Sequence, residues 1–160
     1  MRLYASAREF FEAARDAVRE AERIGRQLDA MESAADGLGG SGFEPRVRST
    51  PDPTRGEARV VALVDHGARL EERRDECYRI IDSACEVLYG TDNHGGLWAL
   101  CGWRADAIFH HYLALRTWDA TAEMLGYSTE HVKREASAAM DVADAWGMAS
   151  TVMGVGGASD

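Results

Sequence analysis

The sequence predicts an all-α protein in which a long antiparallel helical hairpin, a coiled-coil-like arm, precedes a small C-terminal helix-turn-helix domain. Apolar residues alternate at spacings of three and four over residues 3–36 and 57–89, the heptad pattern of packed helices. Residues 37–56 contain all of the chain's prolines and several glycines, which favour a loop between the two helices. A glycine turn between two short amphipathic segments near the C-terminus predicts the second domain.

The first segment of the arm, residues 3–36, keeps its apolar seam without a gap. The seam consists of Leu3, Ala7, Phe10, Ala14, Ala17, Ala21, Ile24, Leu28, Met31 and Ala35. Its many alanines predict a close approach between this helix and its neighbour. An amphipathic helix packed on its own chain and an intermolecular coiled coil both satisfy the pattern. A homodimer through the helical arm therefore stays open.

The second segment, residues 57–89, has a weaker seam because Gly67 and Arg74 occupy two of its positions. The seam consists of Val60, Leu63, Gly67, Leu70, Arg74, Cys77, Ile81, Ala84 and Leu88. Residues 37–56 are expected to form a flexible Gly/Pro loop between the two helices. Residues 1–89 are thus predicted to fold back as an antiparallel hairpin, in which each helix covers the apolar stripe of the other.

Glycines set the remaining boundaries. Residues 90–96 read Gly-Thr-Asp-Asn-His-Gly-Gly and predict a turn between the arm and a domain at residues 97–147. Residues 97–115 are apolar enough for a core helix, or for a helix pair interrupted at Gly102. Residues 148–160 are rich in glycine and small side chains and are expected to form a flexible tail.

Residues 117–139 carry the clearest local pattern in the chain. Trp118, Ala122 and Leu125 lie at i, i+4 and i+7, one apolar face of a short helix. Gly126 follows where a helix can end, and Ser128 is placed to cap a second helix. The second helix would bury Val132, Ala136, Ala139 and Ala143. In the core of this motif, Trp118 and Leu125 are expected to be buried against Ile108, Tyr112 and Val132.

A resemblance to a known family follows from these residues. The pattern Thr117-Trp118, Ala122-Glu123, Leu125-Gly126-Tyr127-Ser128 and Val132 resembles the helix-turn-helix of phage transcriptional regulators of the ArpU/RinA type. Those motifs are in turn similar to region 4 of bacterial sigma factors. The close match is confined to the motif, and Thr121 stands where such motifs usually carry a large aliphatic residue. The resemblance implies a phage or prophage transcription regulator that binds double-stranded DNA and contacts RNA polymerase.

The candidate DNA-binding residues follow from how a helix-turn-helix docks, with the N-terminal residues of its second helix nearest the base edges. They are Arg116, Thr117, Ser128, Thr129, Glu130, His131, Lys133, Arg134 and Ser137. Lys133 and Arg134 are adjacent and diverge around the helix, so one can reach a guanine edge while the other holds a phosphate. In the alternative interpretation, these two side chains only solvate an exposed helix.

The charge of the chain is the main argument against nucleic acid. The formal net charge is −9, whereas DNA affinity comes largely from lysine and arginine side chains that neutralise phosphates. Residues 104–146 are themselves acidic. A monomer is therefore expected to bind DNA with modest affinity, and dimerisation or a second protein would supply the rest.

No catalytic constellation is present in the sequence, so the chain is predicted not to be an enzyme and to use no cofactor. Three cysteines without a Cys-x-x-Cys pair predict reduced thiols in a cytoplasmic protein and no metal site. His110 and His111 are adjacent, so on a helix they diverge by about 100° and cannot share one metal ion. No apolar run approaches the roughly 18 residues of a transmembrane helix, so no membrane partner is expected.

Two other functions stay open from the sequence. A small terminase-like DNA-packaging protein also joins a helix-turn-helix to an oligomerising hairpin, although such proteins more often place the motif first. A coiled-coil adaptor that does not bind DNA is favoured by the acidic charge and by Thr121. The phage or prophage regulator is the leading hypothesis because it accounts for the motif.

Overall fold

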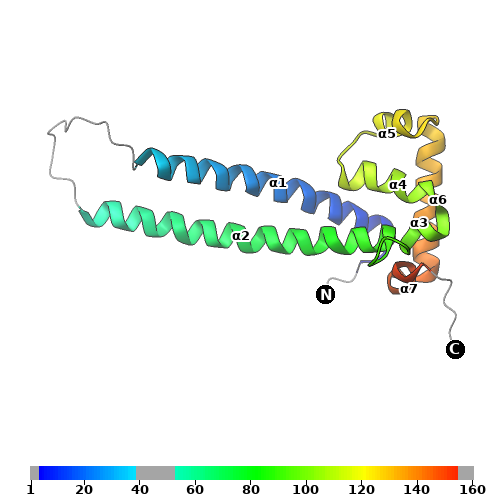
Figure 1. Ribbon diagram of the computed structural model, residues 1–160, viewed down its shortest axis with the longest axis horizontal. Helices are drawn as coiled ribbons and strands as arrows, with labels where there is room; N and C mark the ends of the chain where they lie inside the picture. Colours follow the sequence, from blue (N-terminus) through cyan, green and yellow to red (C-terminus); the bar gives the residue numbers. More distant parts are fainter. Residues whose placement is uncertain (1–3, 39–52, 155–160) are drawn as a thin grey trace. The chain divides into compact units, whose positions relative to one another are not determined.

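A computed structural model describes residues 4–38 and 53–154, and this part of the chain is built from helices and the turns between them (Figure 1). The all-α prediction is therefore confirmed. The elements are α1 (Ala7–Leu38), α2 (Pro53–Tyr89), α3 (Gly96–Cys101), α4 (Trp103–Ile108), the π-helical turn η1 (Phe109–Leu113), α5 (Trp118–Leu125), α6 (Thr129–Trp146) and α7 (Met148–Met153).

Towards the loop between them, both helices of the arm extend further than predicted, but α1 begins only at Ala7, so residues 4–6 of the predicted span 3–36 are not helical. Helix α1 continues to Leu38, and α2 already begins at Pro53, so the predicted loop at 37–56 is too long at both ends. Proline is well suited to the first position of a helix, because its missing N–H would have no intrahelical partner there. The expected flexibility of the connection falls on residues 39–52, which lie outside the described residues.

The chain forms two compact units, and each is described by itself. One unit comprises Glu20–Glu76, and the other comprises Met1–Arg19 together with Cys77–Asp160. This division differs from the boundary expected at residues 90–96, because it passes through both long helices. The first turns of α1 and the last turns of α2 thus belong to the same compact unit as α3–α7.

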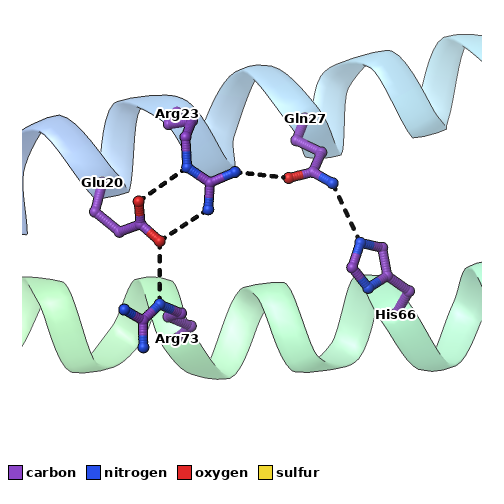
Figure 2. Close-up of polar contacts among 5 residues, drawn as sticks. All are labelled: Glu20, Arg23, Gln27, His66 and Arg73. Carbon is purple, nitrogen blue, oxygen red and sulfur yellow. Dashed lines mark hydrogen bonds and ion pairs between the residues drawn. The ribbon is translucent and has the colours of Figure 1, made fainter.

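In the unit Glu20–Glu76, a polar network joins the two long helices (Figure 2). Arg23 donates two hydrogen bonds to the Glu20 carboxylate, and Arg73 Nε donates a third over 3.0 Å. Further along, Gln27 contacts His66 Nε2 at 3.2 Å. Glu20 of α1 contacts Arg73 of α2, and the later residue Gln27 contacts the earlier residue His66, so the two helices are antiparallel. The hydrogen bonds from Arg23 and Arg73 lower the pKa of Glu20 to about 2.

The other unit has a core to which every element contributes. Its largest fully buried side chains come from α1, α2, the start of α3, α4 and α6: Phe11, Leu88, Leu97, Ile108 and Val132. Burial of such side chains stabilises by roughly 1.5–3 kcal/mol each relative to exposure. The C-terminal domain predicted at 97–147 therefore lacks part of this core when it is considered without the ends of the arm.

The last helix corrects the prediction of a flexible tail at 148–160. Residues 148–153 form α7, in which Thr151 is buried and its hydroxyl donates to the Gly147 carbonyl over 2.8 Å. Helix α7 ends at Gly154, where an added Cβ would lie 2.6 Å from the Gly95 Cα. This close approach of two backbones requires glycine. The small residues of this segment thus allow α7 to pack closely on the rest of its unit. Residues 155–160 of the predicted tail lie outside the described residues.

Candidate nucleic-acid interface

The predicted helix-turn-helix is formed by α5, a tight turn and α6. Thr117 caps α5 by accepting a hydrogen bond from the Ala120 N–H, and Ser128 caps α6 by accepting one from the His131 N–H. Between them, Gly126 has the left-handed backbone (φ 75°) that ends α5, a conformation that costs glycine little. The Ser128 cap and the glycine turn confirm the local structure expected for this motif, and the Thr117 cap adds to it.

The core of α5 differs from the prediction. Trp118 and Leu125 are only partly buried, whereas Thr121 and Ala122 are the buried residues of this helix. Thr121 has no exposed surface, and its hydroxyl donates to the Thr117 carbonyl over 2.9 Å. A satisfied hydroxyl can be buried without a large desolvation cost. Thr121 therefore occupies the aliphatic position of the motif without an unpaired polar group.

Trp118 rests on a buried histidine instead. Its ring stacks on His111 with centroids 3.8 Å apart and meets Tyr112 edge-on at 6.1 Å. His111 Nδ1 donates to the Arg116 carbonyl over 2.8 Å, so its Nε2 is free to accept from Arg15 Nη1 at 3.2 Å. Burial lowers the pKa of His111, and the positive charges of Arg15, Lys133 and Arg19 lower it further. The neutral His111 ring thus holds the start of α5 in place through Arg116 and Trp118.

The segment that leads into α5 has an unusual backbone. The π-helical turn η1 is followed by Leu115, a non-glycine residue with φ 57°. Such a left-handed backbone costs an L-residue about 1–2 kcal/mol, so the surrounding contacts must hold it. The Arg116 N–H donates to the His110 carbonyl over 2.9 Å, and the His111 ring holds the Arg116 carbonyl. Arg116 itself is exposed at the start of the motif.

The N-terminal half of α6 presents an exposed polar face. Glu130, Lys133 and Arg134 are all exposed on it. Two other predicted residues are engaged locally: the Thr129 hydroxyl donates to Asp119 over 2.8 Å, and His131 Nδ1 lies 2.9 Å from Arg134 Nη2. The face that would enter a DNA groove therefore carries two cations and one carboxylate.

The start of α1 contacts the C-terminal half of α6. Arg8 donates a hydrogen bond to the Ser137 hydroxyl over 3.0 Å, and the Ala7 N–H donates to Asp144 over 2.6 Å. Ser137, predicted as a DNA-contacting residue, is therefore already bound by the protein.

Aromatic residues flank the other side of α6. Trp103 stacks on Tyr127 with centroids 4.5 Å apart, and His131 lies 5.8 Å from the Trp103 ring. Arg104 donates a hydrogen bond to Glu135, and this contact lowers the pKa of the Glu135 carboxyl. The Glu135 carboxylate therefore stays ionised, but the positive charge of Arg104 compensates its negative charge next to the exposed face of α6.

Sequence reasoning missed two cations that the fold brings to this site. Arg15 and Arg19 of α1 lie close enough to His111 to lower its pKa, as does Lys133 of α6. Their i, i+4 spacing places the two arginines on one face of α1. This spacing is the one feature of the sequence that could have indicated that they act together. Their proximity to the motif depends on the tertiary structure, because more than 90 residues separate them from it.

The described residues include no group of three or more histidine, cysteine, aspartate or glutamate side chains that could hold a metal ion. Within the same described ranges, no helix is long and apolar enough to cross a membrane. The comparisons with known proteins found no match to a family model, to a curated protein or to a solved structure.

Proposed function

We propose that this chain binds double-stranded DNA through α6 and acts as a phage or prophage transcriptional regulator. The observation that carries the proposal is a helix-turn-helix capped at both helix starts, with Lys133 and Arg134 exposed on the first turns of α6. A recognition helix uses these turns to contact base edges. The regulatory role, including contact with RNA polymerase, rests on the resemblance of residues 117–132 alone.

The two cations have different expected roles because they point in different directions. Lys133 shares a face of α6 with Ser137, which α1 contacts through Arg8, so Lys133 is placed at the edge of a groove and suits a phosphate. Arg134 is the next residue, about 100° further around the helix, and is exposed. An arginine there suits a guanine edge, with a discrimination of about 1–3 kcal/mol for a bidentate contact.

A titration at several salt concentrations tests the proposal. Labelled duplexes tile the region that surrounds the chain's own coding sequence, and fluorescence anisotropy gives the dissociation constant of each. The double variant Lys133→Ala with Arg134→Ala should bind more weakly and flatten the slope of log affinity against log salt by about one to two units. The control is Arg59→Ala with Arg69→Ala, which changes the charge equally at two exposed positions of α2.

Two results would count against the proposal. If the wild type shows no salt-dependent binding to any of these duplexes, DNA binding fails. A ring of many subunits in size-exclusion chromatography with light scattering would instead favour the DNA-packaging alternative.

An adaptor function is the second candidate, and one observation favours it. Val60, Val61 and Val64 of α2 are 54%, 58% and 65% exposed, and the first two line a shallow groove with Gly56 and Glu57. Exposed apolar side chains that cluster on one helix are typical of protein-binding surfaces. In this function α6 would not contact DNA, and substitution of the three valines by serine would abolish partner capture without affecting the fold.

A further inference from the structure

Three cations from two distant parts of the chain meet beside the exposed turns of α6. Arg15 and Arg19 come from α1, and Lys133 comes from α6. Arg15 contacts His111 at 3.2 Å, and Arg19 follows one helical turn later on the same face of α1. Arg8, on the same face, contacts Ser137, which lies one turn after Lys133 on α6. In agreement with this arrangement, Arg15, Arg19 and Lys133 each lower the pKa of His111. These three cations form what we call the α1–α6 cationic cluster. All of them belong to one compact unit.

The positive charge of the cluster is poorly balanced by the protein. Among the described residues, Arg15 contacts the neutral His111 ring at 3.2 Å, and its Nε is buried without a hydrogen-bond partner. In the described part of the chain, the ion-pair partner of Arg19 is Asp16 at 3.9 Å, and the Asp16 side chain is 80% exposed. An exposed pair at this separation is weak and readily exchanged.

Carboxylates on the same helix reduce this positive charge without removing it. Besides Asp16, Glu12 of α1 lies near the cluster, since it raises the pKa of Tyr112 while Arg8 and Arg15 lower it. Glu12 is exposed and has no ion-pair contact among the described side chains. Like charges held close together repel each other, so an anion that bridges Arg15, Arg19 and Lys133 would be stabilised.

The position of the cluster identifies the anion that fits it. Lys133 is exposed on α6 and lies one helical turn before Ser137, which Arg8 of α1 contacts. When a recognition helix enters a major groove, its edges face the phosphates that line the groove. A row of cations along that edge would follow a DNA strand rather than read its bases.

We propose that Arg15 and Arg19, together with Lys133, clamp backbone phosphates of the duplex that α6 contacts, so that the first turns of α1 are part of the DNA interface. This inference rests on the proposed function. It explains how an acidic chain with few cations on α6 gains affinity, because α1 supplies additional charge at the groove edge.

The test uses two opposite changes of charge in the full-length chain. Arg19→Gln removes an exposed cation, and Asp16→Asn removes its competing carboxylate. Arg19→Gln should weaken binding and flatten the salt slope by about one unit, the change for one phosphate contact. Asp16→Asn should tighten binding. The matched controls are Arg69→Gln and Asp65→Asn in α2, which are exposed and belong to the other compact unit.

The double variant Arg15→Gln with Arg19→Gln should flatten the slope further, by about two units in all. Because Arg15 also contacts His111, thermal unfolding must show that this variant remains folded, and Arg19→Gln alone decides the test if it does not. If Lys133→Ala with Arg134→Ala weakens binding while Arg19→Gln and Asp16→Asn behave like their controls, the clamp is refuted and the proposed function survives. If the wild type binds no duplex, both fail.

Discussion

Removal of the Trp118 side chain tests how the helix-turn-helix is attached to its domain. A fully buried tryptophan costs about 3–5 kcal/mol when truncated to alanine. Trp118 is only partly buried, but it stacks on His111 at 3.8 Å and meets Tyr112 edge-on, and aromatic pairs contribute about 0.5–1.5 kcal/mol beyond their buried area. Trp118→Ala is therefore expected to lower the free energy of unfolding by about 2–3 kcal/mol, less than full burial would give.

This change is measurable by thermal unfolding followed by circular dichroism at 222 nm. For a chain of this size, 1 kcal/mol corresponds to about 2–4 °C, so the Tm should fall by about 5–10 °C. Trp146→Ala is the matched control, because Trp146 is 44% exposed and should change the stability by no more than about 0.5 kcal/mol. If the two variants have the same Tm, Trp118 does not hold the motif and the reasoning is refuted.

Three further predictions concern pH and backbone packing. His111 has a lowered pKa, so its contribution to stability is present above its ordinary pKa of 6.5 and is lost as the pH falls through the folded value; His111→Asn should flatten the decline of Tm between neutral and acidic pH. Glu20, with a pKa of about 2, should likewise stabilise the arm above its ordinary pKa of 4.5 and lose this contribution as the pH falls towards 2; acid titrations of wild type and Glu20→Gln that coincide would contradict this. Gly96→Ala should cost at least about 3 kcal/mol, from left-handed strain and overpacking together, because an added Cβ would lie 2.5 Å from backbone atoms of Leu88. Gly126→Ala, with similar strain but open space around it, should cost only about 1–2 kcal/mol, and urea titrations of both variants measure the difference.

The comparison of Gly96 with Gly126 shows where sequence reasoning was sufficient. Gly126 follows an amphipathic segment and precedes a capping serine, and the observed turn has the predicted form because each of these signals acts between near neighbours in the chain. Gly96 was expected only to be part of a turn. The reason that it must be glycine is the backbone of Leu88 and Tyr89, and this contact does not follow from local sequence.

The sequence by itself determined the two long helices, the two helices of the motif with the Ser128 cap of α6, and the all-α class, because periodicity and capping are local properties. The tertiary structure decided which helix faces remain accessible. It placed Arg8 of α1 on Ser137, and it gathered Arg15 and Arg19 around His111 beside Lys133. It also left Trp118 partly exposed and buried Thr121 in its place. These outcomes depend on how the ends of the long helices pack with the C-terminal elements, and that packing is set by the whole shared core rather than by any one segment.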